Sequence, residues 1–394
     1  VLLDDVGFGW PSVNGGLVRM PVAERRAKNG LFYNQFHTTA LCSPTRAAML
    51  TGRNHHTVAT GVIQEMATGY PGYCGIIPKS CATFAEMLKH AGYSSAWFGK
   101  NHNVPDNLTS PAGPFDNWPT YQGFDYFYGF ISGETDQFYP SLLRNTTPVE
   151  PPKRPEEGYH LTKDLAEECI GWIRQQKAIA PDRPFCAYFS TGAAHAPHQP
   201  PLDWRGKNKG RFDMGWDEYR KVVHQQQLDA GIIPAGTKLT ERPEQIPSWD
   251  SHPKDQQELF AVQAENYADF LEHTDFAVGQ VIDAIEAMGD LDNTLVIVTS
   301  DNGMAFPRAK ANCFEFGVHV PLAIMWPGRA KGGREVTDPV GFVDLTATIL
   351  EVGGVTHPAL GQVALAPVGR SLVSLLESGK SGRVEPQRTH VFSG

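Results

Sequence analysis

The chain has 394 residues, of which 41% are hydrophobic and 20% are charged, and its formal net charge at pH 7 is −9. A chain of this kind can bury one large core, or one large and one small core; no apolar run approaches the ~18–20 residues of a membrane span, and six cysteines are too few for a disulfide scaffold. The excess of acidic residues argues against nucleic acid or an anionic membrane as a partner, because such partners bind clusters of Lys and Arg.

The first predicted strand, Val1–Leu3, is followed directly by Asp4 and Asp5. Side chains of adjacent strand residues point to opposite faces, so both carboxylates can reach one ion only where the strand ends and the backbone bends. Gly7 and Gly9 favour such a bend. The pair is therefore a candidate ligand pair for a hard cation, and a solvated acidic turn is the alternative.

A second predicted strand, Leu31–Phe36, precedes a candidate reactive group at Cys42. Pro44 suits the first turn of a helix, which places Cys42 at the helix N-terminus, where the macrodipole and free N–H groups favour an anion. Arg46 lies one turn further along on the same face and can assist that anion. The alternative is a buried structural Cys in front of an amphipathic helix.

The next patterns predict a helix at Cys81–His90 and a strand at Ser94–Phe98. Lys100 and His102 follow this strand and are candidates for a site at its end; a solvated Lys and a surface His are the alternatives. The stretch Asn103–Pro155 is rich in Pro, Gly and Asn without a sustained period. It is predicted to be a long loop over the site.

A helix is then predicted at Thr162–Gln176 and a strand at Phe185–Ser190. Two histidines, His195 and His198, follow this strand, so either can lie at its carboxyl end. The stretch Pro197–Pro253 has the same loop-like composition as the earlier one and is predicted to be a second long loop.

The longest helical pattern, Gln256–Met288, leads into the strongest predicted strand, Thr294–Thr299. Asp301 and Asn302 follow this strand, and the last apolar strand is predicted at Pro321–Trp326. Strands that alternate with helices indicate an α/β fold with a large, mostly parallel sheet between helices. In such folds ligand sites gather at the carboxyl ends of the strands.

Four oxygen-bearing side chains from the two ends of the chain are expected to converge on one cation. They are Asp4, Asp5, Asp301 and Asn302. An all-oxygen shell suits Ca²⁺ or Mg²⁺, whereas sets rich in His or Cys suit zinc.

The string that begins at Cys42, C-S-P-T-R, and its extension through Gly52 resemble the signature of the type I sulfatase family. The Asp4-Asp5 pair and the S-D-N-G string at Asp301 match that family in order and spacing, and the resemblance extends to about Leu376. It implies an alkaline-phosphatase-like fold with a large, mixed, mostly parallel sheet. It also implies a catalytic α/β domain at 1–355 and the start of a small, apparently truncated C-terminal subdomain at 356–394.

The resemblance further implies that Cys42 is oxidised to formylglycine by a maturation enzyme that reads the Cys, Pro and Arg of the motif. One divalent cation, Ca²⁺ in preference to Mg²⁺, would be held by the four oxygen ligands together with residue 42.

The resemblance also implies roles for the basic residues. Of the two histidines it selects His195, and it adds Lys310 in front of the string A-N-C-F-E-F-G-V-H-V-P. His102 would aid the second step of the reaction. The implied ligands of the sulfuryl oxygens are Arg46, Lys100, His195 and Lys310.

The implied reaction is hydrolysis of a sulfate ester, an aryl sulfate or a sulfated carbohydrate, to an alcohol and inorganic sulfate. The family favours a periplasmic or secreted protein. A phosphonate monoester or phosphodiester hydrolase of the same superfamily and an inactive homologue that is never matured stay open as alternatives. Whether Cys74 and Cys81 pair also stays open.

Overall fold

The computed structural model describes residues 1–307, 309–355 and 367–394. The beginning of the subdomain expected from residue 356, up to residue 366, lies outside the described residues. None of the helices in the described ranges combines the length and the apolarity that a bilayer span requires.

The main sheet has ten strands: β1 (Leu2–Leu3), β2 (Leu31–Tyr33), β4 (Ser94–Lys100), β5 (Tyr126–Phe130), β6 (Leu143–Arg144), β7 (Thr147–Pro148), β8 (Phe185–Ser190), β9 (Val296–Ser300), β10 (Leu322–Met325) and β11 (Arg334–Val336). Their order is β11-β2-β10-β9-β1-β8-β4-β5-β6-β7. The central strands β9, β1, β8, β4 and β5 are parallel, whereas β10, β6 and β7 run antiparallel to their neighbours. The predicted mixed, mostly parallel sheet is confirmed.

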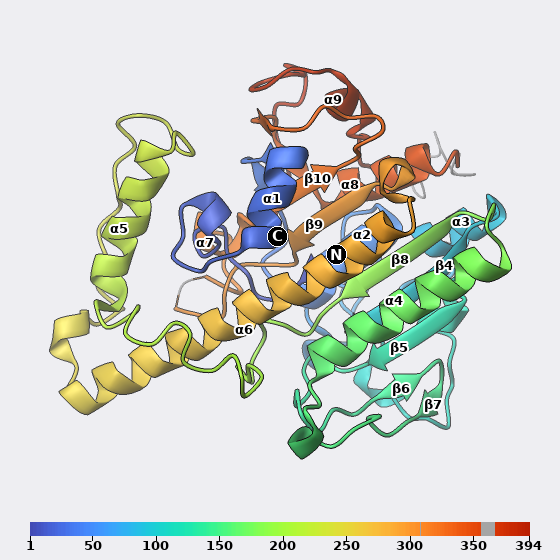
Figure 1. Ribbon diagram of the computed structural model, residues 1–394, viewed down its shortest axis with the longest axis horizontal. Coiled ribbons are helices and arrows are strands. Elements are labelled where there is room, and N and C mark those ends of the chain that lie inside the picture. Colours follow the sequence, from blue (N-terminus) through green and yellow to red (C-terminus); the bar gives the residue numbers. More distant parts are fainter. Residues whose placement is uncertain (308, 356–366) are drawn as a thin grey trace.

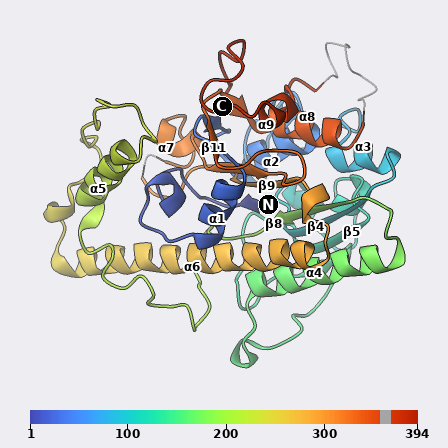
Figure 2. The ribbon, with the colours of Figure 1, turned by 45° about the horizontal axis from the view of Figure 1, so that its top comes forward.

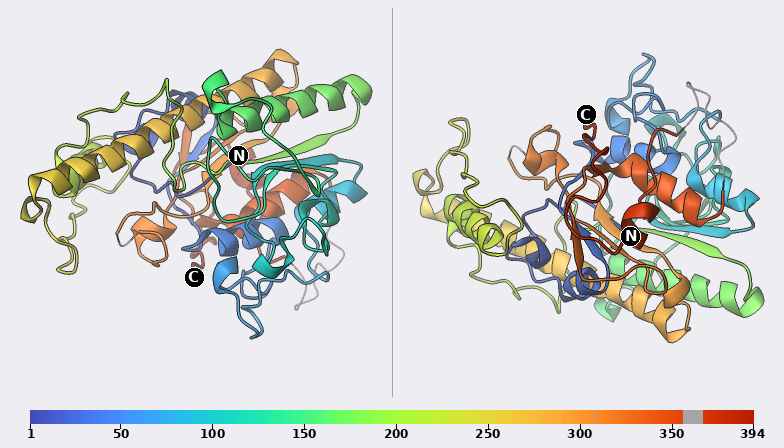
Figure 3. Two further views of the ribbon diagram at one scale, coloured as in Figure 1. Left: turned by 90° about the horizontal axis from the view of Figure 1, so that it is seen from below. Right: turned by 90° about the horizontal axis from the view of Figure 1, so that it is seen from above.

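Helices cover both faces of this sheet. The helices of the described residues are α1 (Pro21–Asn29), α2 (Cys42–Thr51), α3 (Phe84–His90), α4 (Leu161–Ile179), α5 (Gly215–Asp229), α6 (Lys254–Ala287), α7 (Glu315–Val318), α8 (Phe342–Val352) and α9 (Val373–Glu377), of which α5 lies apart from the sheet (Figure 1). Figures 2 and 3 show α4 and α6 on one face and α2, α3 and α8 on the other. Each face has its own apolar core, with Leu165 and Phe270 in one and Leu50, Leu88 and Leu345 in the other.

The predicted strand Leu31–Phe36 is wrong in its extent. The chain bends at Asn34 and leaves the main sheet, and β3 (Phe36–His37) pairs instead with β12 (Val340–Gly341) in a separate two-stranded sheet. The polar residues Asn34 and Gln35 lie at the break, but the apolar pattern resumes at Phe36 and so favoured a single strand.

Both predicted loops contain regular structure. Asn103–Pro155 includes β5, which pairs in parallel with β4, and the β6–β7 hairpin. Pro197–Pro253 includes α5, which stands beside the N-terminal end of α6 at the edge of the molecule (Figure 1). The prediction failed because β5 is defined by pairing with a distant strand, while α5 buries only Gly215 and Val223 and so lacks an apolar stripe.

The long helix α6 is present as predicted, but its apolar stripe is buried only in part. Leu259 and Val262 are 55% and 48% exposed, whereas Phe270 and Ile282 are buried. The first turns of α6 extend past the sheet, so they have no core to cover (Figure 1).

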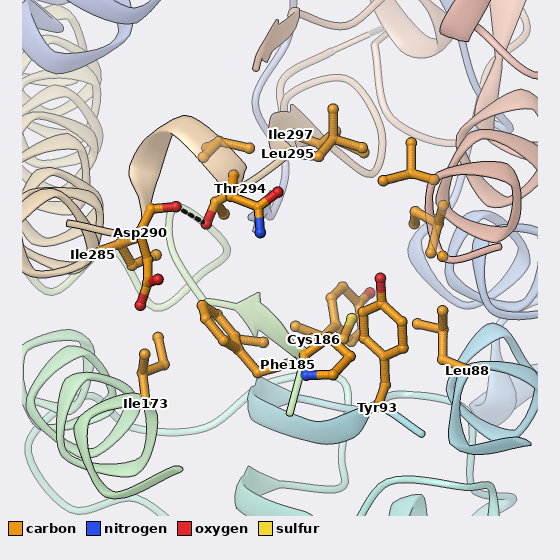
Figure 4. Close-up of a pocket in the computed structure, with 18 of the residues that line it drawn as sticks. Leu88, Tyr93, Ile173, Phe185, Cys186, Ile285, Asp290, Thr294, Leu295 and Ile297 are labelled. Carbon is orange, nitrogen blue, oxygen red and sulfur yellow. Dashed lines mark hydrogen bonds between the residues drawn. The ribbon is translucent and has the colours of Figure 1, made fainter. Parts of the chain in front are cut away.

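A cavity of about 800 Å³ lies at the amino edge of the sheet. Figure 4 shows Phe185 and Cys186, at the start of β8, facing Leu295 and Ile297 beside the start of β9. The short β1 separates β8 from β9 only near their carboxyl ends, where it pairs with Ser190, so this cavity occupies the space between them. The motif residues lie at the opposite edge.

Candidate active site

Four neighbouring parallel strands bring distant segments of the chain to one edge of the sheet. Asp301 follows β9, Asp4 follows β1, Ser190 ends β8 and Lys100 ends β4. Helix α2 begins beside them at Cys42, and all five residues are buried. Residues separated by nearly three hundred positions in the sequence therefore form one cluster.

A local change of backbone conformation turns Asp4 and Asp5 toward the same cluster. Asp5 has φ of 57°, in the left-handed region that Asp tolerates better than most residues, so the strand alternation ends there. The Asp5 N–H donates to Oδ1 of Asp301 at 3.1 Å, and the Asp4 N–H donates to the carbonyl of Ala193 at 2.9 Å. Both carboxylates are fully buried.

The guanidinium of Arg46 lies at the centre of the cluster. It donates to Oδ2 of Asp301 from Nη2 at 2.8 Å and from Nε at 3.0 Å, and it lies 3.3 Å from Oδ2 of Asp4. It also donates to the Ser190 hydroxyl at 2.6 Å and to the Lys100 carbonyl at 3.1 Å. Burial alone would lower the pKa of Arg46, but the two carboxylates outweigh it, so Arg46 stays charged.

Two lysines balance the remaining carboxylate charge. Nζ of Lys100 lies 2.6 Å from Oδ2 of Asp4, and Nζ of Lys310 lies 2.9 Å from Oδ2 of Asp5. Burial raises the pKa of Asp4, but Lys100, with smaller contributions from other cations, brings it below its ordinary value. Burial lowers the pKa of Lys310, but the opposite effect of Asp5 and other anions is larger. The net pKa lies above its ordinary value, so Lys310 is protonated at neutral pH.

The cluster also contains oxygen atoms without partners. Oδ1 of Asp4 and Oδ1 of Asn302 are buried, and neither has a hydrogen-bond partner among the described residues. Such atoms are costly unless a donor or a cation satisfies them. Asp4, Asp5 and His195 each offer a ligand atom within 4.8 Å of the others. This donor set fits a hard divalent cation, since most of its atoms are carboxylate or amide oxygens.

The other two predicted ligands, Asp301 and Cys42, are not part of this group. Both carboxylate oxygens of Asp301 are engaged, one by Arg46 and the other by the Asp5 N–H. Cys42 and Asp301 are not members of the compact ligand groups found in the part of the chain that the structure describes.

The two histidines after β8 differ in their surroundings. Nδ1 of His195 donates to the carbonyl of Ala196 at 2.7 Å, which leaves Nε2 facing Oδ2 of Asp5 at 3.8 Å. Burial and nearby Lys100 lower the pKa of His195, so the ring is neutral at pH 7. His198 packs edge-on against Tyr267, with ring centroids 5.3 Å apart.

Cys42 lies at the first turn of α2 and is 1% exposed. Burial raises the pKa of its thiol, but Lys100, His102 and other cations outweigh this effect, and the net pKa is lowered. His102 contacts the thiol; burial lowers the pKa of His102, but Cys42 and Glu65 raise it overall. The surroundings of residue 42 therefore favour negative charge.

Sequence reasoning missed Glu65. Its carboxylate accepts from Nε2 of His102 at 2.9 Å, and this hydrogen bond, more than any other influence, lowers the pKa of Glu65 to about 2. Glu65 lies in a single 3-10 turn, Gln64–Met66, whose sequence has no apolar period, so only the folded chain shows it next to His102. Ser190 was missed too, although its position at a strand end is a usable signal.

We expect Glu65→Gln to lower kcat roughly tenfold, by analogy with the loss of other residues that orient a reactive His, with little change in KM. Removal of the carboxylate lowers the pKa of His102, so the acidic limb of the pH–rate profile moves to lower pH. The profile should not move in Glu244→Gln, because Glu244 is exposed in another loop. An unchanged acidic limb in Glu65→Gln would show that Glu65 does not act through His102.

Buried carboxylates and cations at the carboxyl edge of an alkaline-phosphatase-like sheet, beside a thiol at a helix N-terminus, define a hydrolase of charged esters. The Sulfatase family model matches residues 1–355, so the chain belongs to the sulfatase family, which comprises sulfuric ester hydrolases.

Two curated relatives are similar in sequence, and two solved structures are similar in fold. An uncharacterized sulfatase of Schizosaccharomyces pombe is 28% identical over 96% of this chain and 79% of its own length. The arylsulfatase of Klebsiella aerogenes is 26% identical over 77% of this chain and 65% of its own length.

The structure of Ps i-CgsB has a TM-score of 0.70 and 21% identity over 97% of this chain and 76% of that one. The phosphonate monoester hydrolase SpPMH from Silicibacter pomeroyi has a TM-score of 0.62 and 19% identity over 96% and 76%.

Proposed function

We propose that this protein hydrolyses sulfate esters of small molecules or sugars, with residue 42 acting as formylglycine and with one bound Ca²⁺. The observation that carries the proposal is the position of Cys42 beside the buried Lys100 and Arg46 and the partly exposed Lys310, which together surround it with positive charge. A sulfate ester carries one negative charge on its sulfuryl oxygens, and this pocket supplies the charge that attracts it.

Arg46, Lys100 and Lys310 are the proposed ligands of the sulfuryl oxygens. Each is held by a carboxylate of the cluster, so its position is set before substrate arrives. Preorganised cations of this kind stabilise charge that develops in the transition state without a reorganisation cost.

The proton transfers are proposed from the state of each group. Lys310 is protonated and partly exposed, so it is the proposed donor to the departing alcohol oxygen, while neutral His195 lies ready to accept or relay a proton. The aldehyde of residue 42 would react as its hydrate, which has two hydroxyls. Asp301 helps remove the proton from the hydroxyl that bonds to sulfur as the alcohol leaves. His102 assists when the second hydroxyl loses its proton, the aldehyde re-forms and sulfate is released.

The cation would be held by Asp4, Asp5, Asp301 and Asn302, together with residue 42. Two of these side chains carry the unpartnered oxygens described above. When bound, the ion supplies positive charge that offsets the charge developing on sulfate oxygens. Ca²⁺ is preferred to Mg²⁺ because carboxylate and amide ligands in an irregular shell suit the larger ion.

The proposal is tested by comparing 4-nitrophenyl sulfate, 4-nitrophenyl phosphate and a phenylphosphonate under identical conditions. We expect the highest kcat/KM with the sulfate. A preference for either phosphorus substrate would contradict the sulfatase proposal, and a preference for the phenylphosphonate would support the phosphonate branch, whose member SpPMH has a similar fold. A further screen of aryl sulfates against sulfated sugars would define the substrate class.

Maturation of Cys42 is tested by intact mass and peptide mapping of protein co-expressed with a formylglycine-generating enzyme. Conversion of the thiol to the aldehyde lowers the mass by about 18 Da. An active-site peptide with unmodified Cys42 from the native host would support the inactive-homologue alternative.

Removal of the cation should reduce both activity and stability. We expect EDTA to lower kcat/KM by more than about 100-fold, and Ca²⁺ to restore it better than Mg²⁺. Saturating Ca²⁺ should also raise the melting temperature, since an ion at 100 times its dissociation constant adds about 2.7 kcal/mol to stability. Asp4→Asn should lose most of this thermal shift, measured by calorimetry. A shift of equal size in Asp4→Asn would place the ion elsewhere.

A further inference from the structure

A second group of potential metal ligands lies outside the candidate active site. His37 ends β3, Glu315 begins α7 and His319 follows α7. One ligand atom from each of the three lies within 4.8 Å of the others. The proposed function uses none of these side chains.

The contacts of His319 determine which of its ring nitrogens carries a proton. Its Nε2 lies 3.0 Å from the carbonyl oxygen of Asn34, which can only accept, so Nε2 carries the hydrogen. The ring also stacks on Phe8, with centroids 3.8 Å apart, and is 9% exposed. In the neutral ring Nδ1 therefore has only a lone pair.

That lone pair faces another acceptor. Nδ1 of His319 lies 3.0 Å from Oε2 of Glu315. In the neutral ring, Nδ1 and the carboxylate oxygen are both acceptors and cannot hydrogen-bond to each other, whereas a cation between them would bind both.

His37 completes the group at the other oxygen of the same carboxylate, and its ring stacks on that of His319. Its Nε2 lies 3.0 Å from Oε1 of Glu315. Bonds of about 2.0–2.1 Å in a tetrahedral zinc site place the ligand atoms ~3.3 Å apart, close to both distances. The side chain of Glu315 is 72% exposed, so solvent can reach the remaining coordination position.

The donor types select the kind of metal. Two imidazole nitrogens and one carboxylate suit Zn²⁺ and similar transition-metal ions, whereas Ca²⁺ and Mg²⁺ prefer oxygen ligands. The hydrogen bond from His319 to the Asn34 carbonyl is the outer contact that typically orients a metal-bound His.

We propose that His37, Glu315 and His319 bind one Zn²⁺-type ion, separate from the Ca²⁺ of the proposed active site. The ion would connect β3 to α7. The residue after β3, Thr38, already donates its N–H to the Val318 carbonyl of α7 at 2.8 Å. β3 leads into the helix of Cys42, so a bound ion stabilises the segment in front of that helix.

The test is a titration of Ca²⁺-saturated protein with Zn²⁺ by calorimetry and with Co²⁺ by visible absorption. The background variant Cys313→Ser removes an exposed thiol that lies near Glu315 in the sequence. We expect His37→Gln and His319→Gln each to lose one equivalent of Zn²⁺, or to bind it more than about 100-fold more weakly. His224→Gln, on α5, is the matched control and should bind as the background does.

Two variants are tested so that a folding defect in one of them does not decide the result. The side chains of His37 and His319 are 13% and 11% exposed. Circular dichroism and the melting temperature without Zn²⁺ show whether each variant is folded. The same Zn²⁺ stoichiometry and affinity in folded His37→Gln as in His224→Gln would overturn the proposal, as would the absence of tetrahedral Co²⁺ bands in the background protein. Neither result bears on sulfate hydrolysis, so the two proposals fail independently.

Discussion

Cys42→Ala is expected to lower kcat/KM for 4-nitrophenyl sulfate by about 10⁴-fold or more, since removal of a nucleophile costs on this scale. The side chain is buried beside Lys100 and His102, and Ala occupies the same space without a group that can be oxidised. The small change in volume leaves α2 intact. Steady-state kinetics of co-matured wild-type and variant proteins, with matched melting temperatures, measure the effect.

Cys186→Ala is the control for this experiment. Cys186 is a free thiol in the cavity at the opposite edge of the sheet, so its loss should leave kcat/KM within a factor of two or three (Figure 4). Retention of more than about a hundredth of the activity in Cys42→Ala would rule out residue 42 as the nucleophile.

Arg46→Ala is expected to lower both activity and stability. Its guanidinium pairs with Asp301 and Asp4 at full burial, and loss of one partner of a buried ion pair costs about 3–5 kcal/mol. The same change removes a proposed ligand of the sulfuryl oxygens, so kcat/KM should fall by roughly 10³-fold. Kinetics and denaturant unfolding measure the two effects separately.

Arg46→Lys separates charge from geometry. A lysine keeps the positive charge but cannot donate to Asp301, Ser190 and the Lys100 carbonyl at once, so we expect stability to recover more than activity. Arg25→Ala is the control, because its exposed pair with Asp283 should contribute less than about 1 kcal/mol. A wild-type kcat/KM in Arg46→Lys would contradict a specific role for the several N–H donors of the guanidinium group.

Much of the candidate site could be predicted from local patterns. Asp4, Lys100 and Asp301 each follow an apolar strand pattern, and parallel strands in an α/β fold end at the same edge, so their meeting was expected. Glu65 could not be predicted in this way, because it reaches His102 from a short 3-10 turn within a long connection. Its role depends on the path of a loop, and loops have no period to read.

Local sequence patterns also could not predict which charged groups pair within the cluster. The motif shows that Arg46 lies near Cys42, but not that its guanidinium turns toward Asp301 and Asp4. The positive φ of Asp5 is another such feature, and it occurs where Asp5 makes hydrogen bonds with Asp301, after β9, and Tyr267 of α6. These two contacts join residues 296 and 262 positions apart in the sequence.

The sequence by itself determined the α/β class, the identity of the motif residues and the oxygen-rich character of the expected cation site, because strand and helix periods and side-chain chemistry are local properties. Only the tertiary structure decided that β3 leaves the main sheet, that β5 joins it, and that His37 meets Glu315 and His319. The physical reason is that these features depend on which distant surfaces pack together and which hydrogen-bond partners they bring. Apolar periodicity specifies that a face is buried, but not against what.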